Sequence, residues 1–235
     1  MIRSSSVILA CLAACETYDT VPAAHAPSLA SGILDAERQM HARYSAAMAM
    51  EQAIAHGDLE TARAEARTLD FEEPEILAQY QPFLQVVRAD AHRVVVSAGL
   101  DSASVSAANV GRACARCHEA TGAHVTFPVV QPPRGNDTLA SDMSGHQWAA
   151  LQMWQGLIGP ADELWQTGAS GLTKMPANIL AQLTTRAPDD DIDDVARIKL
   201  YANRAVDAHA QDARAELFGR ILATCAHCHS ALRDR

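Results

Sequence analysis

The chain has 235 residues, enough for one large domain or for two of about 100 residues each. Its formal net charge of −9 argues against a nucleic-acid partner, because binding to phosphates requires clustered lysine and arginine. Alanine and other helix-forming residues are abundant, whereas glycine and aromatic residues are few, and this composition predicts an all-α fold.

The N-terminus resembles a bacterial targeting segment. Arg3 precedes the apolar stretch VILACLA, which is too short to span a bilayer. This stretch leads into Leu-Ala-Ala-Cys, which resembles a lipoprotein box and implies cleavage before Cys15 and lipid attachment to that residue. The alternative is a secretory signal that is cut after Ala24-His25-Ala26. Either alternative exports the protein. The lipoprotein interpretation predicts a signal peptide over 1–14, a tether over 15–30 and a periplasmic, membrane-anchored location in a Gram-negative-type bacterium.

Four helices are expected in the first part of the chain. Asp58 is the expected N-cap of the second helix, and Gly99 the residue that ends the third. Pro82 should bend or break the third helix. Asp101 is the expected N-cap of the fourth helix, which should end at Gly122. The expected ranges are 31–56, 58–69, 74–98 and 101–122.

A linker rich in proline and turn-forming residues is expected over 123–141, and helices resume after it. The acidic run PDDDIDD should lie at a helix start, where the helix dipole favours negative charge. The expected helices are 142–158, a short helix ending at 167, 176–186, one from the acidic run to 209, and a last one that carries residues 225–229.

Segments 40–69 and 143–172 have equal length and are identical at eight of thirty positions, with an offset of 103 residues. Two Cys-x-x-Cys-His motifs are 111 residues apart, so the second unit should contain about eight additional residues, most simply around 168–191. The sequence therefore predicts a tandem duplication of a four-helix unit, with domains over 31–122 and 142–235.

The two motifs carry the chemistry. Residues 114–118 are CARCH and residues 225–229 are CAHCH, and on a helix the two cysteines and the histidine share one face. Two thioethers can then hold a porphyrin edge while the imidazole reaches the iron, which predicts two covalently bound haem c groups. Disulfide or dithiol chemistry and a four-thiolate zinc site are the alternatives. The expected thioether residues are Cys114, Cys117, Cys225 and Cys228, and the expected proximal iron ligands are His118 and His229.

Because each motif is on the last helix of its predicted unit, the chain resembles the cytochrome c′ family and its low-spin relatives, which are four-helix bundles with the motif near the C-terminus. The resemblance covers residues 31–122 and 139–235 and implies that the three preceding helices form the haem pocket. A competing interpretation takes Met175-Pro176 as the ligand segment of an ordinary cytochrome c domain over 110–186, but it leaves the second motif unexplained.

In the resembled family the distal side of the iron faces the first helix, and the corresponding positions are Arg43 for the first haem and His146 for the second. His146 could bind iron through a ring nitrogen, or it is an exposed histidine near a helix start. Arg43 cannot bind iron and is expected to pair with a propionate. Met40 and His41 are the candidate distal ligands of the first haem, unless that site is five-coordinate.

The expected function is electron transfer rather than catalysis: a dihaem cytochrome that exchanges single electrons with redox partner proteins of the cell envelope. The alternative is a haem-based enzyme or gas sensor for peroxide, NO or CO, with an open first haem and Arg43 beside it. A helical scaffold with a zinc site made from both motifs is a third possibility. Membrane contact is expected only through a lipid on Cys15.

Overall fold

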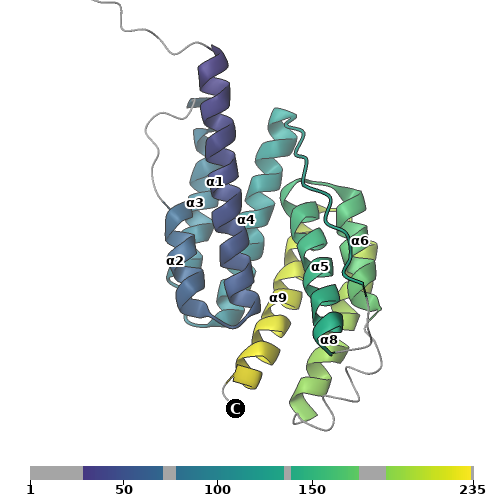
Figure 1. The fold of residues 1–235 in the computed structure, drawn as a ribbon. Coiled ribbons are helices and arrows are strands. Elements are labelled where there is room, and N and C mark those ends of the chain that lie inside the picture. Colours follow the sequence, from purple (N-terminus) through teal and green to yellow (C-terminus); the bar gives the residue numbers. More distant parts are fainter. Residues whose placement is uncertain (1–28, 71–77, 135–138, 175–188, 234–235) are drawn as a thin grey trace, which may run out of the picture.

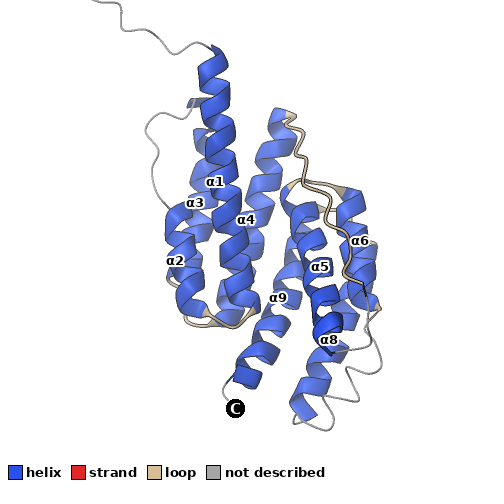
Figure 2. Cartoon of the chain, in the orientation of Figure 1, coloured by secondary structure: helices blue, strands red, loops and turns tan. Residues whose placement is uncertain are grey.

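The computed structural model describes residues 29–70, 78–134, 139–174 and 189–233. Within these ranges the chain consists of helices and loops and contains no strand (Figure 2). The prediction of an all-α fold is confirmed. None of the described helices combines the length and the apolar character needed to cross a membrane.

The first four helices, called the first half below, form a group in which each helix contacts the next and the first also contacts the last (Figure 1). Their bounds are α1 (Leu29–Ala55), α2 (Leu59–Leu69), α3 (Gln81–Val95), which follows the short 3-10 turn η1 (Ala78–Tyr80), and α4 (Leu100–Thr121).

The last four described helices, called the second half, repeat these contacts. Their bounds are α5 (Leu139–Ile158), α6 (Asp162–Thr173), α8 (Asp189–Val206) and α9 (Gln211–Arg233). The extended connection after α4 runs along α5 and is held there by the indole of Trp148, whose Nε1 donates to the carbonyl of Val130 at 2.7 Å.

Several helix boundaries follow from local chemistry as predicted. The side chain of Asp58 accepts a hydrogen bond from the Thr61 amide at 3.0 Å and caps α2. Gly122 ends α4 with a φ of 66°, in the left-handed region that glycine adopts without a steric penalty.

Other boundaries differ from the prediction. Gly99, not Asp101, is the N-cap of α4, and the hydroxyl of Ser102 accepts a hydrogen bond from the Gly99 amide. The third helix already ends at Val95. Pro82 neither bends nor breaks it, because Pro82 lies in the first turn, where the missing amide hydrogen costs no helical bond.

In the second half, α5 begins before residue 142, α6 continues beyond residue 167, and α8 ends before residue 209. The expected helix over 176–186 and the expected signal peptide and lipid site lie outside the described residues, apart from the start of α1 at the end of the tether.

The two halves meet along α4 and α9, which run antiparallel. A side chain at Gly219 of α9 would place its Cβ 3.4 Å from that of Ala108 of α4, so the two helices cross closely there. At one end of the pair, Arg112 and Arg116 of α4 bind the Asp212 carboxylate at the start of α9, at 2.7 and 2.9 Å.

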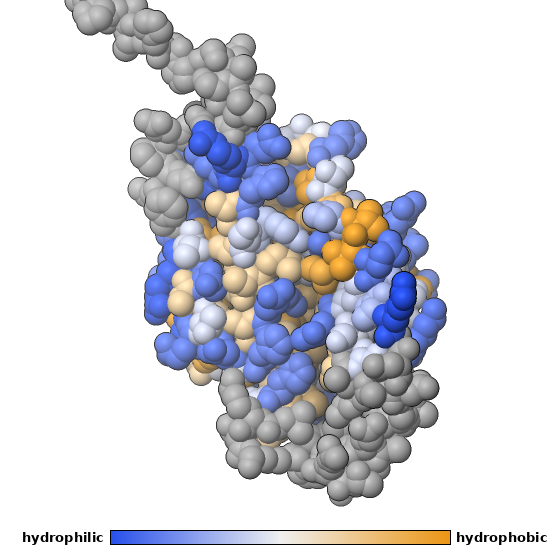
Figure 3. Space-filling model, in the orientation of Figure 1, coloured by the Kyte–Doolittle hydropathy of each residue, from blue (hydrophilic) through white to orange (hydrophobic). Residues whose placement is uncertain are grey.

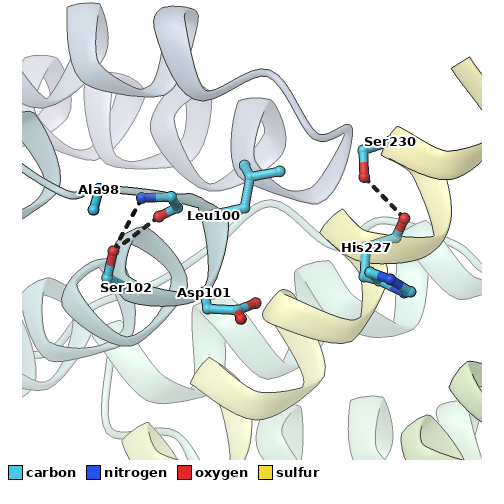
Figure 4. A pocket seen from close by; sticks show the side chains of 7 residues that line it. Ala98, Leu100, Asp101, Ser102, His227 and Ser230 are labelled. Carbon is cyan, nitrogen blue, oxygen red and sulfur yellow. Dashed lines mark hydrogen bonds between the residues drawn. The ribbon is translucent and has the colours of Figure 1, made fainter. Parts of the chain in front are cut away.

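At the other end of the pair, the start of α4 meets the end of α9. Asp101 and Ser102 line one side of a shallow pocket of about 420 Å³, and His227 and Ser230 line the other (Figure 4). This arrangement places the first motif and the second motif at opposite ends of the α4–α9 pair.

Buried apolar residues from both halves form one continuous core. Trp154 of α5 is fully buried and stacks on Phe218 of α9 with ring centroids 5.4 Å apart. A Cβ at Gly111 of α4 would lie 2.8 Å from the Trp154 ring, so α4 and α5 also pack closely. On the face in Figure 3, hydrophilic residues surround smaller hydrophobic areas; Val129 and Val130 of the α4–α5 connection are among the exposed apolar residues.

Candidate functional site

Each motif lies in the C-terminal part of the last helix of its half, the first on α4 and the second on α9. No disulfide bond joins any of the four motif cysteines, which are all partly buried. Burial raises the pKa of the thiols of Cys114 and Cys225 to about 12, so these thiols are neutral at physiological pH. Dithiol redox chemistry needs a thiolate of low pKa, whereas this environment raises the thiol pKa.

The structure does not bring the two motifs together. Cys114 and Cys225 each lie past the crossing of α4 and α9 at Ala108 and Gly219, and because the helices are antiparallel they diverge from it. In the part of the chain that is described, no group of three or more His, Cys, Asp or Glu side chains is placed to hold a metal ion. The alternative of a zinc site shared by the motifs therefore has no geometric support.

The two motif histidines make the same kind of contact, each with a different main-chain carbonyl. Nδ1 of His118 lies 2.9 Å from the carbonyl oxygen of Ile158, and Nδ1 of His229 lies 2.6 Å from that of Ala55. A carbonyl only accepts hydrogen bonds, so Nδ1 is the donor in both cases. In the neutral ring Nε2 then keeps its lone pair, which is the form that binds a metal.

The surroundings of His229 contain a second histidine. The ring of His56, in the turn that follows α1, stacks on His229 with centroids 5.6 Å apart and an interplanar angle of 21°. Nε2 of His56 lies 3.1 Å from Nε2 of Gln147 on α5. Burial lowers the pKa of His229, and its hydrogen bond to Ala55 opposes this shift.

His146, the candidate distal ligand of the second haem, lies on α5 within electrostatic reach of His229. Its Nε2 atom is buried and has no hydrogen-bond partner among the described residues. Burial lowers the pKa of His146 to about 4, the Asp142 carboxylate opposes the shift, and the charge of His229 adds to it. The ring is therefore neutral at physiological pH, with a buried nitrogen that nothing in the described chain satisfies.

Arg43, at the matching position of the first half, lies within electrostatic reach of the first motif. Burial is the main cause of the raised pKa of Cys114, and the positive charge of Arg43 opposes it. A guanidinium in this place can pair with a carboxylate but cannot coordinate a metal.

The two other candidates for the first site, Met40 and His41, are both exposed residues of α1. The side chain of His41 is 78% exposed and faces Glu37 at 4.0 Å. Met40 is 37% exposed, whereas the core methionines Met50 and Met153 are fully buried. The structure does not bring His41 to the first motif.

Sequence reasoning missed His56 and the two main-chain carbonyls that hold the motif histidines. The second motif has a further contact: Nδ1 of His227 lies 2.5 Å from the buried carboxylate of Asp194. Arg197 binds the other oxygen of that carboxylate at 2.9 Å. For the carbonyls, a sequence signal exists only in hindsight: Ala55 and Ile158 are separated by the repeat offset of 103 residues.

Comparison of the chain with descriptions of known protein families, with curated protein sequences and with solved structures finds no match.

Proposed function

We propose that the protein is a dihaem c-type cytochrome that carries electrons in the bacterial cell envelope. The observation that carries this proposal is the Nδ1 hydrogen bond from each motif histidine to a main-chain carbonyl. Such a bond fixes the orientation of an imidazole ligand and leaves Nε2 available for iron. It occurs at both Cys-x-x-Cys-His motifs, the attachment pattern for haem c.

We further propose that the halves are tandem bundles of the cytochrome c′ type. Helix order and helix contacts correspond between the halves, and matching positions such as Met50 and Met153, or Leu69 and Leu172, are buried in both. The helices α3 and α8 end 111 residues apart, whereas α2 and α6 begin 103 residues apart. The additional residues of the second half therefore fall between the start of α6 and the end of α8.

The residues of the chain fit two haem groups of different coordination. When bound, haem iron supplies one-electron chemistry. The buried, unsatisfied Nε2 of His146 would supply a further nitrogen ligand for the iron at the second site, and Arg43 would pair with a propionate at the first site. The thioethers would come from Cys114 and Cys117 for the first haem and from Cys225 and Cys228 for the second, with His118 and His229 as proximal ligands.

The proposal is tested on the full-length protein, expressed with a c-type haem attachment system. The pyridine haemochrome spectrum and the intact mass should both report two covalently bound haems per chain. Replacing Cys114 and Cys117 by alanine should leave one haem, and so should the matched replacement of Cys225 and Cys228. A protein that carries no haem, or zinc instead of iron, would contradict the proposal.

A second candidate function is a haem enzyme or sensor for peroxide, NO or CO at the first site. The observation that favours it is that an arginine, Arg43, stands near Cys114 where His146 stands in the second half, while His41 faces solvent. An arginine near an open iron could stabilise charge that develops on peroxide oxygen. High-spin features that shift on addition of CO would favour this function, and two low-spin haems that do not react with CO would rule it out.

The proposed location in the cell envelope rests on the sequence before α1. If Cys15 carries lipid, the protein should sediment with membranes, and Cys15→Ala should release it into the soluble fraction. The net charge of −9 suits a redox partner with a basic surface, so electron exchange should slow as ionic strength rises.

A further inference from the structure

Each motif histidine donates its Nδ1 hydrogen bond to a main-chain carbonyl in the other half of the chain. His118, on α4 of the first half, donates to Ile158, the last residue of α5 in the second half. His229, on α9 of the second half, donates to Ala55, the last residue of α1 in the first half. The halves thus exchange one hydrogen bond in each direction.

The exchange occurs at matching positions, which argues that it is built into the fold. Ala55 and Ile158 are 103 residues apart, as are the starts of α2 and α6, and each is the last residue of the first helix of its half. Close packing supports both contacts. A Cβ at Gly57 would lie 3.0 Å from Cβ of Ser230 on α9, and one at Gly111 on α4 would lie 2.9 Å from Leu157 on α5.

We infer that each proximal histidine is oriented by the opposite half of the chain, and that Ala55 and His56 of the first half are positioning residues for the second haem, with Ile158 serving the first. The inference rests on the proposed function. Groups that hold a ligand's second nitrogen fix its orientation and raise its basicity, which tunes the potential of the iron.

Besides Arg43 and His146, the two sites differ in a side chain that stacks on the motif histidine and that a substitution can remove. His56 stacks on His229, but the matching position in the second half is Gly159, which has no side chain to place against His118. The carbonyls of Ala55 and Ile158 belong to the main chain and survive any substitution. His56 is therefore the point at which the inference can be tested without disturbing the motif of either half.

The test is His56→Ala in the full-length protein with both haems attached, studied by spectroelectrochemical titration and by EPR of the oxidised form. With the stacked ring gone, the hydrogen bond from His229 to Ala55 should loosen, and His229 should become a weaker donor to ferric iron. We expect the midpoint potential of the second haem to rise and its EPR g values to change, while those of the first haem stay unchanged. His146→Ala identifies the signals of the second haem.

Two variants serve as controls. His56→Phe keeps a ring that can stack and should restore most of the wild-type potential, whereas His41→Ala removes an exposed histidine of α1 and should change neither haem. Gly159→Ala is the reciprocal variant: its Cβ would lie 2.6 Å from Phe127, and the shift at the end of α5 should affect the first haem more than the second.

The inference is overturned if His56→Ala leaves the second haem unchanged, or if it changes the first haem instead. Either result leaves the dihaem assignment intact, because both haems would be present in the variant. A wild-type protein without haem overturns the proposed function and this inference together.

Discussion

The two motif histidines have the same kind of main-chain partner but different neighbours, and this contrast separates what the fold requires from what each site adds. Near His229 lie two further histidines, His146 and the stacked His56. Arg43 is the residue of the first half that matches His146, and Gly159 is the residue of the second half that matches His56. The hydrogen bond to a main-chain carbonyl is common to both sites, whereas His56 and His146 are found only at the site of His229.

The largest effect should come from removing His146. Under the proposed function, His146→Ala should convert the second haem from a six-coordinate, low-spin centre into one that binds CO, because the variant lacks the ligand nitrogen. Arg43→Ala, the matched change in the first half, should leave the spin state of the first haem as it is. Optical spectra of the reduced proteins with and without CO would measure both. If His146→Ala stays fully inert to CO, His146 is not an iron ligand.

Next in size is the loss of Trp165, which fills the second half where the first half has Ala62. Trp165 is fully buried, donates through Nε1 to Ala205 at 2.7 Å, and lies under the guanidinium of Arg214 at 5.3 Å. Trp165→Ala should lower the free energy of unfolding by about 3–5 kcal/mol, because it leaves a large cavity and an unpaired carbonyl. Urea unfolding would measure this. Trp148→Ala, at a partly exposed indole, should cost clearly less.

Glu51 should make stability depend on pH, since the matching residue of the second half is the neutral Trp154. Burial raises the pKa of Glu51 from 4.5 to about 7. The native state therefore keeps a proton that the unfolded state has lost, so this contribution is present below about pH 4.5 and disappears as the pH rises through 7. We expect unfolding free energy to fall by up to about 3 kcal/mol over that range.

Glu51→Gln should remove most of this decrease, and unfolding curves at pH 5 and pH 8 would compare the two proteins. The matched control is Glu60→Gln on exposed surface of α2, which should leave the pH dependence of the wild type unchanged. A Glu51→Gln protein as sensitive to pH as the wild type would assign the effect to other groups.

The smallest effect concerns the start of the second helix in each half. Asp58 caps α2 through its side chain, whereas Ala161, the matching residue, has no side-chain hydrogen bond at the start of α6. Asp58→Ala should cost about 1 kcal/mol, and Ala161→Asp should add up to about 1 kcal/mol. Thermal unfolding of both variants measures the difference. Equal and negligible effects would show that capping contributes little at this turn.

How far the sequence alone could go depends on the range of the interactions. The cap at Asp58 and the left-handed end of α4 at Gly122 were predictable, because each is decided within a few residues. Asp101 was misassigned as the N-cap because α4 begins two residues earlier than expected, with Gly99 as its N-cap and the Ser102 hydroxyl accepting from the Gly99 amide. Pro82 was read as a break because its position relative to the helix start was unknown.

The candidate site was predictable where it depends on side-chain identity and not where it depends on the main chain. His146 could be selected from the Cys-x-x-Cys-His motif together with the position on the first helix that faces the iron in the resembled family. The structure places His146 near His229. The carbonyls of Ala55 and Ile158 could not be found, because every residue has a carbonyl and only the packing of α1 on α9 and of α5 on α4 selects these two.

The antiparallel crossing at Ala108 and Gly219 has a consequence for ancestry. These residues are 111 positions apart, like the motifs, so the crossing joins two equivalent points and has the geometry of a two-fold axis. A hypothetical progenitor of half the length would have left its α4 surface bare and its histidine without a carbonyl partner. Under the proposed tandem arrangement, two identical copies related by such an axis would have covered both α4 surfaces and given each histidine a carbonyl partner. Fusion of two gene copies would then have joined the subunits of an existing homodimer.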